Sequence, residues 1–267
     1  MGGRTIACMI TRLLRSRAHT FLCALTFGGE VLVALRGMVG ARPLWRLAQW
    51  QRLMAQASAE AVPIVWVVNA LVGAIMAFVG AVQLQKFGAG LYVADLVGIS
   101  VCREMAALIT AVVMAGRTAA AFASELATMQ ANEEIDALHV LGVDPMRELV
   151  VPRVLVLMGM MPLLFFHACV AALLGGLVVA TGMLDLNAQA FIQRVMVATA
   201  PVHLWMGLGK AFCFGIWLAL AGCYAGLQAQ RTAAGVGQAA TQAVVNGIVG
   251  IIVLDAVFAV MADALHW

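Results

Sequence analysis

The sequence predicts an all-α integral membrane protein with five transmembrane helices, an N-terminal interfacial amphipathic helix, and a cytoplasmic helical segment between spans two and three. Three observations support this fold class. The 267 residues are 64% hydrophobic and only 11% charged, with a mean hydropathy of +0.99, whereas a soluble domain carries roughly a quarter charged residues. Five apolar stretches are long enough to cross a bilayer, and the basic residues divide unequally between the two sides. The chain is expected to form one domain, residues 1–267.

Residues 1–60 are expected to lie at the membrane interface. Within residues 17–58, arginines recur among Leu, Val and Trp, a mixture typical of an amphipathic helix at a bilayer surface. The arginines near the N-terminus and the apolar stretch after them superficially resemble a signal peptide. Glu30 and Arg36 interrupt that stretch, and no small-residue cleavage site stands out. We therefore expect this segment to be retained.

Residues 61–265 are expected to form the five-span bundle, because a transmembrane helix needs about 20 consecutive, mostly apolar residues. The expected spans are residues 62–84, 90–116, 154–184, 195–230 and 232–262. Pro162 is expected to kink the third span, because proline removes a backbone hydrogen bond from a helix.

Orientation follows from the basic residues, because positively charged loops stay in the cytoplasm. With the N-terminus inside and the C-terminus outside, only Lys86 and Arg194 face outward. Twelve arginines then face the cytoplasm: Arg4, Arg12, Arg15, Arg17, Arg36, Arg42, Arg46, Arg52, Arg117, Arg147, Arg153 and Arg231.

A polar passage, residues 117–153, is the one long cytoplasmic connection in this topology. Apolar residues at helical spacing form stripes on otherwise charged segments. The stripes comprise Leu126 and Met129, then Ile135, Leu138 and Leu141. From these residues alone, the passage is either a helical hairpin packed against the bundle or a docking element for a partner protein.

The same passage carries signals for helix ends. Asn132 is expected to cap the N-terminus of a helix. Three acids fall in its first turn, where the helix dipole favours negative charge: Glu133, Glu134 and Asp136. Gly142 suits the position just past the C-terminus, and Asp144-Pro145 forces a turn before the next helix. The passage is therefore expected to hold short, well-capped helices.

Four ionisable residues fall inside the predicted spans: Arg103, Glu104, Lys210 and Asp255. A charged side chain at the bilayer centre costs about 2.5–3.5 kcal/mol on insertion scales, so these residues are expected to face one another or a polar cavity. They would either form ion pairs that fix helix register or line a transport cavity, and the two roles can coexist.

The sequence offers no catalytic equipment of its own. It contains no G-x-x-x-x-G-K-[ST] phosphate-binding loop, no H-E-x-x-H and no G-x-S-x-G, which argues against an ATPase and against an intramembrane enzyme. The six cysteines are scattered singly, so neither a disulfide framework nor a metal site is expected. We expect no catalytic residue, no cofactor or metal in this chain, and no nucleic-acid partner.

Several linked motifs appear in order along the chain. They stand as Ala115-Gly116-Arg117, Glu125-Leu126-Ala127-Thr128-Met129, Glu133-Glu134-Ile135-Asp136-Ala137-Leu138, Gly142-Val143-Asp144-Pro145 and Pro152-Arg153, with Arg103-Glu104 upstream and Ala234-Gly235-Val236 and Asp255 downstream. Together they resemble the signature of the MlaE family, permease subunits of ABC transporters that work with mammalian-cell-entry (MCE) domain proteins on lipids. The resemblance covers roughly residues 60–265. Two departures are visible: Asn132 replaces the family's Thr, and Ala106-Ala107 replaces a Gly-Pro, which removes a helix breaker from span two.

The resemblance implies that residues 125–141 include a coupling helix that sits in a groove of a separate ATPase subunit. The implied coupling residues are Glu125, Leu126, Met129, Glu133, Glu134, Ile135, Asp136 and Leu138, with Gly142, Asp144 and Pro145 forming the turn. ATP and Mg²⁺ would be bound by that partner.

The resemblance also implies an MCE-domain partner, a phospholipid substrate and a bacterial inner membrane, with the C-terminus in the periplasm. It favours a lipid cavity lined by the four intramembrane charges. A chain of five spans is small for a lipid pathway, so a homodimer is expected. The alternative is an ion- or proton-coupled carrier that uses Arg103, Glu104, Lys210 and Asp255 directly.

Overall fold

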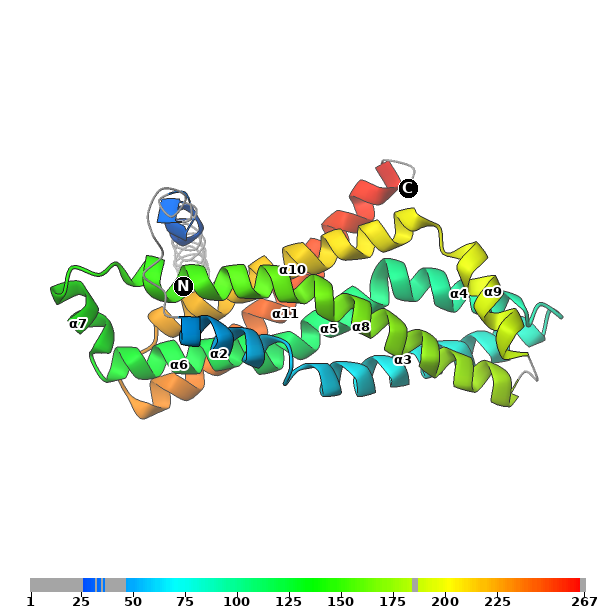
Figure 1. The fold of residues 1–267 in the computed structure, drawn as a ribbon, viewed down its shortest axis with the longest axis horizontal. Coiled ribbons are helices and arrows are strands. Elements are labelled where there is room, and N and C mark those ends of the chain that lie inside the picture. The colour runs from blue at the N-terminus through cyan, green and yellow to red at the C-terminus, as the bar shows by residue number, and fades with distance from the viewer. Residues whose placement is uncertain (1–25, 32, 35, 37–46, 184–186, 265–267) are drawn as a thin grey trace, which may run out of the picture.

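The computed structural model describes residues 26–31, 33–34, 36, 47–183 and 187–264, and these residues form helices joined by short connections (Figure 1). In chain order the elements are α2 (Leu47–Ala57), α3 (Val62–Gln85), α4 (Tyr92–Ser100), η1 (Val101–Met105), α5 (Ala106–Met114), η2 (Ala115–Ala119), α6 (Ala120–Ala131), α7 (Glu134–Val140), η3 (Met146–Val150), α8 (Val151–Met183), α9 (Ala188–Ala198), α10 (Pro201–Leu227) and α11 (Ala233–Ala264). The elements labelled η are π-helical turns within longer helices.

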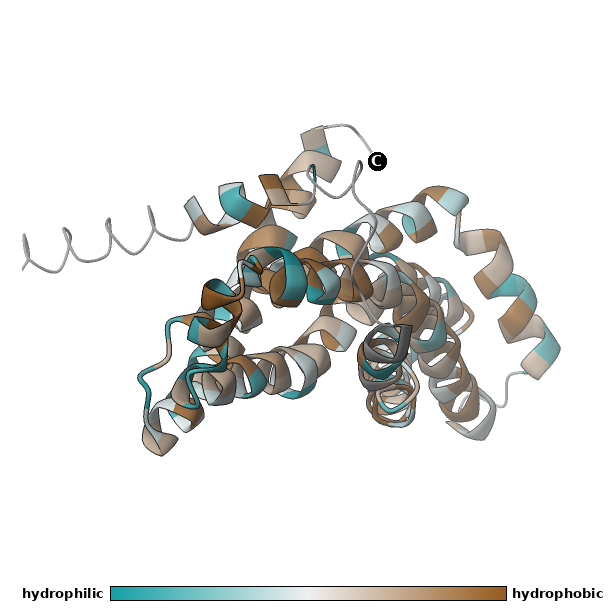
Figure 2. Cartoon of the chain, turned by 60° about the vertical axis from the view of Figure 1, so that its left-hand side comes forward, coloured by the Kyte–Doolittle hydropathy of each residue, from teal (hydrophilic) through white to brown (hydrophobic). Residues whose placement is uncertain are grey.

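Among the described residues, five helices are long and apolar enough to cross a membrane. They are Val62–Gln85, Tyr92–Ala131, Met146–Met183, Pro201–Leu227 and Ala233–Ala264. Figure 2 shows that hydrophobic residues predominate along these helices. The predicted fold class, an all-α membrane protein with five spans, is confirmed.

The second span is longer than the sequence predicted. The helix does not end near Gly116 but continues as one rod of 40 residues from Tyr92 to Ala131. Residues 117–131 are rich in alanine, the strongest helix former, so one arginine does not interrupt them. This helix widens into π turns at η1 and η2. The expectation of separate short helices throughout residues 117–153 is therefore wrong for its first part.

The core lies where α8 and α10 pack between their neighbours. α8 contacts α3 and α10, while α10 also contacts α6 and α11. Large, wholly buried apolar side chains fill this region, among them Phe165 and Leu164 on α8 and Phe214 and Leu218 on α10. Pro162 lies inside α8, which remains helical from Val151 to Met183, and the kink at this residue stays a prediction.

The two ends of the long axis carry different elements (Figure 1). α7 lies at one end, and α4 and α9 lie at the other. The fourth span begins at Pro201 and not at residue 195, because α9 is a separate helix that ends at Ala198. The side chain of Asn187 caps α9 by accepting a hydrogen bond of 3.0 Å from the Gln189 amide.

Two parts of the predicted interfacial region are described. Residues 26–31 are helical, and the Phe27 ring meets the Tyr224 ring of α10 edge-on, with centroids 5.4 Å apart. α2 follows and contacts α8. Residues 1–25 and 37–46, with most of the predicted N-terminal arginines, lie outside the described residues, and the interfacial placement of this region stays a prediction.

Candidate functional site

The charged residues that the sequence placed inside spans come together in the structure. Lys210 on α10 lies between two carboxylates: its Nζ donates to Asp255 Oδ1 on α11 at 2.8 Å and to Glu104 Oε2 on η1. The Lys210 side chain is wholly buried, whereas the Glu104 and Asp255 side chains are each about a quarter exposed. Arg103 Nε lies 3.9 Å from Glu104 Oε1 and completes the group. We call these four residues the charge cluster.

Close packing of α10 on η1 makes this contact possible. A Cβ atom added at Gly207 would lie 2.2 Å from the carbonyl oxygen of Cys102, so only glycine permits the observed approach. Lys210 follows Gly207 by about one helical turn and points to the same side. Glu104 lies in the π turn Val101–Met105, and such turns occur frequently at functional sites.

The cluster is balanced in formal charge, with two cations and two carboxylates. Its ion pairs join Arg103 to Glu104, and Glu104 and Asp255 to Lys210, so the charges face one another, which is one of the two arrangements that the sequence left open. Within the described residues, no three His, Cys, Asp or Glu side chains are placed to hold a metal ion. The arrangement can keep paired charges inside a membrane, and it leaves the carboxylates of Glu104 and Asp255 partly exposed.

The apolar residues of the predicted coupling segment form part of the core. Leu126 is wholly buried and Ile135 is nearly so, while Met129 and Leu138 are partly buried against the same core. These four side chains therefore attach α6 and α7 to the bundle, and Met129 and Leu138 remain partly exposed.

The acids of the coupling segment are mostly engaged within the chain. Glu125 Oε2 accepts from Arg153 Nη2 at 2.8 Å, and Arg153 is buried. Arg231, between α10 and α11, pairs with both Glu133 and Asp136. Glu134 is exposed, and its Oε1 accepts a 3.2 Å hydrogen bond from the side-chain Nδ2 of Asn132.

Asn132 is not the N-cap that the sequence suggested. It follows the last residue of α6, and the residue that precedes α7 is Glu133, which has φ 60° and ψ 16° in the left-handed region. The acids in the first turn of α7 are Glu134 and Asp136. The expectation failed because α6 extends through residues that were assigned to a connection.

Two strongly exposed apolar residues lie at the end of α7, and the sequence did not predict them as a surface. Val140 is 88% exposed and Leu141 is 75% exposed. The sequence places Leu141 in one apolar stripe with Ile135 and Leu138, but in the structure it follows the last helical residue and is exposed. We call Val140 and Leu141 the tip of α7. The only signal for it in the sequence is that these apolar residues stand just before Gly142.

The predicted turn after α7 is confirmed. Gly142 has φ +72°, its amide donates to the His139 carbonyl at 3.0 Å, and the Val143 amide donates to the Leu138 carbonyl at 2.9 Å. These two bonds form a Schellman motif, in which glycine permits the left-handed conformation. Asp144 Oδ1 then accepts a 3.0 Å bond from the Met146 amide and starts the helix that contains α8.

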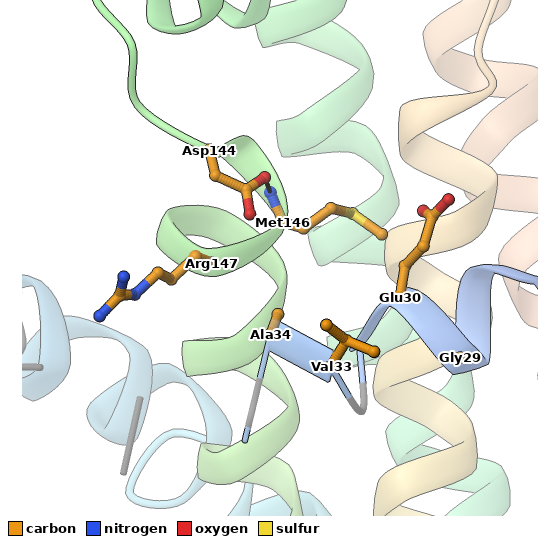
Figure 3. A pocket seen from close by; sticks show the side chains of 7 residues that line it. All are labelled: Gly29, Glu30, Val33, Ala34, Asp144, Met146 and Arg147. Atoms are coloured by element: carbon orange, nitrogen blue, oxygen red, sulfur yellow. Dashed lines mark hydrogen bonds between the residues drawn. The ribbon is translucent and has the colours of Figure 1, made fainter. Parts of the chain in front are cut away.

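A cavity of about 650 Å³ adjoins this turn, as Figure 3 shows. It lies between the helical residues 29–31 and 33–34 on one side and the start of η3 on the other. Its lining residues are Gly29, Glu30, Val33, Ala34, Asp144, Met146 and Arg147. The predicted turn residue Asp144 therefore contributes to a cavity wall as well as to a helix start.

The opposite end of the molecule carries an ion pair that the sequence did not predict. Arg194 Nη2 on α9 lies 3.0 Å from Asp95 Oδ2 on α4, and the guanidinium lies 4.9 Å from the Tyr92 ring centroid. This contact holds α9 against α4, the first part of the second span.

Five helices able to cross a membrane, with a charge cluster among them, are the features of a multi-pass membrane protein. Comparison with known proteins identifies the family. The profile of a family described as Permease MlaE matches residues 50–261, and the chain belongs to this family.

Relatives agree with this assignment. A probable ABC transporter permease protein of Rickettsia conorii is 34% identical over 73% of this chain and 75% of its own length. One of Synechocystis is also 34% identical, over 73% of this chain and 74% of its own length. The Arabidopsis thaliana chloroplastic protein TRIGALACTOSYLDIACYLGLYCEROL 1 is 29% identical over 65% of this chain and 49% of its own length. The chain is an ABC transporter permease of the MlaE family.

Proposed function

We propose that this permease moves phospholipid or a related lipid between the inner membrane of a bacterium and a periplasmic MCE-type lipid-binding partner. A separate ATPase subunit drives the movement, and two copies of the chain form the pathway. The family assignment and a plant relative named for trigalactosyldiacylglycerol, a lipid, support the lipid substrate.

The observation that carries the proposal is the exposed tip of α7. An ABC permease implies an ATPase partner, and a permease must offer that partner a firm contact on the cytoplasmic side. Val140 and Leu141 project from a helix that is fixed to the core through Ile135 and Leu138. Exposed apolar residues on a fixed element are typical of a docking surface. We assign this tip to the ATPase groove, together with the exposed acid Glu134 at the start of α7.

The partly exposed carboxylates support a second copy and a polar cavity. Glu104 and Asp255 are each about a quarter exposed on the single chain, although both lie within membrane-crossing helices. A charge facing lipid is expensive, and intramembrane charges normally face a bundle interior or a water-filled cavity. A symmetric partner would cover this face, and the charge cluster would then line a cavity able to hold lipid headgroups.

The test of the docking surface is Leu141→Asp in the full chain, expressed with its ATPase subunit. Burying a carboxylate in an apolar groove costs several kcal/mol, so we expect ATPase co-purification and lipid transfer in reconstituted vesicles to fall at least about tenfold. Val197→Asp is the matched control, because Val197 is 82% exposed at the opposite end, on α9.

Equal ATPase recovery from the Leu141→Asp variant and from the control would contradict the docking assignment. An inactive ATPase subunit separates the proposal from the carrier alternative. Transfer by the complex should then stop, whereas a carrier driven by the charge cluster alone would continue to move its substrate.

A further inference from the structure

The connection between α10 and α11 carries an arginine that reaches across to α7. Arg231 Nη2 lies 2.8 Å from Asp136 Oδ2, and Nη1 lies 3.7 Å from Glu133 Oε1. The Arg231 side chain is 47% exposed. One guanidinium therefore links two acids at the start of the proposed docking helix to a different part of the chain.

Arg231 makes its contact at the junction between α6 and α7. Glu133 is the residue at this junction, and it adopts a left-handed conformation that residues other than glycine adopt reluctantly. Asp136 lies one turn further on, in α7 itself. A displacement of α7 about this junction therefore changes the positions of both acids relative to Arg231.

The connection that holds Arg231 is short and internally bonded. The Gln228 amide donates to the Tyr224 carbonyl at 3.2 Å, and the Gly235 amide donates to Thr232 Oγ1 at 3.1 Å. A Cβ atom at Gly235 would lie 2.2 Å from the Gln230 carbonyl oxygen, so the turn is also tightly packed. A force on Arg231 therefore passes to α10 and α11 and is not absorbed by a loose loop.

The helices on either side of this connection carry two members of the charge cluster. Lys210 lies on α10 and Asp255 lies on α11, while Glu104 lies on the span that ends with α6. Small side chains pack these three helices together near Arg231: Ala123 and Ala127 of α6, Ala225 of α10, and Ala239 and Ala243 of α11. Lys210 is about 25 Å along α10 from its end at Leu227, at 1.5 Å per residue.

We propose that Arg231 is a positioning residue that ties the docking helix to α10 and α11, so that movement of the ATPase reaches every helix of the charge cluster. The covalent route runs from α7 through α6 to Glu104. The ionic route runs from α7 through Arg231 to Lys210 and Asp255. This inference rests on the proposed docking of an ATPase at α7, and it adds a second path for the coupling.

The test uses the full chain and its ATPase subunit in phospholipid vesicles, with lipid transfer and ATP hydrolysis measured together. For Arg231→Gln we expect the ATPase to remain bound and the lipid transferred per ATP to fall about fivefold or more, the lower end of typical coupling between sites. Arg231→Lys should recover most of the transfer, because it keeps the charge. Arg194→Gln is the matched control, since Arg194 pairs with Asp95 at 3.0 Å in a similarly exposed setting at the other end.

Three results would overturn the inference. These are unchanged transfer per ATP in Arg231→Gln, an equal loss in Arg194→Gln, or loss of the bound ATPase in Arg231→Gln, which would make Arg231 only a support of the docking site.

A second measurement separates this inference from the lipid part of the proposed function. Spin labels at Val67 on α3 and Val260 on α11, both exposed, should report a distance that changes with ATP in the wild-type complex. That change should disappear in Arg231→Gln even where no lipid transfer is detected. If the distance between the labels still changes with ATP in Arg231→Gln, the proposed role of Arg231 is contradicted. If the distance changes in the wild-type complex but no lipid is transferred, only the proposed substrate is contradicted.

Discussion

The charge cluster and the Arg231 contact are both groups of ion pairs, but they lie in opposite surroundings. Lys210 is wholly buried among membrane-crossing helices, whereas Arg231 is 47% exposed at the end of the bundle. Breaking a buried ion pair by removing one partner typically costs about 3–5 kcal/mol. An exposed pair contributes about 0–1 kcal/mol. The first group can therefore hold the fold, while the second can change during a transport cycle at little cost.

The largest effect is expected for Lys210→Met. The change leaves Glu104 and Asp255 without their shared cation, and we expect about 3–5 kcal/mol of destabilisation. Thermal unfolding of the detergent-solubilised protein, followed by size-exclusion chromatography, measures this loss. Adding Asp255→Asn to the same chain should restore much of it, because Glu104 keeps its contact with Arg103 and Asp255 no longer carries a charge. An unchanged unfolding midpoint for Lys210→Met would show that the cluster does not support the fold.

A smaller effect on stability is expected for Glu104→Ala. Lys210 keeps its 2.8 Å contact with Asp255 in this variant, so we expect the folded complex to survive. Lipid transfer by the reconstituted complex should nevertheless fall, because the partly exposed carboxylate is lost from the proposed cavity. If the complex fails to assemble, the cluster acts in helix register, and its proposed role in transport loses support.

The sequence predicted the helices of the membrane well for a physical reason. A helix that crosses a bilayer must be apolar over most of its length, so composition alone located all five spans. The cost of intramembrane charge likewise indicated that Arg103, Glu104, Lys210 and Asp255 would face one another or a polar cavity, without deciding between the two. Both inferences depend on the membrane, because the bilayer restricts which residues a spanning helix can contain.

The sequence was less informative about helix ends and exposed faces. Asn132 has the side chain of an N-cap, yet the alanine-rich helix α6 extends through residue 131, and Glu133 is the residue before α7. Leu138 and Leu141 share helical spacing, but the Schellman turn at Gly142 directs Leu141 outward. The Arg231 contact joins residues almost a hundred positions apart and leaves no local pattern.

The central claim is that the tip of α7 lies in the cytoplasm, where an ATPase can reach it. Single cysteines at Leu141 and at Val197, in a chain whose six native cysteines are replaced by serine, would be exposed to a membrane-impermeant maleimide in bacterial spheroplasts. We expect the Val197→Cys variant to be labelled in intact spheroplasts and the Leu141→Cys variant to be labelled only after the membrane is permeabilised. Labelling of the Leu141→Cys variant in intact spheroplasts would contradict the account.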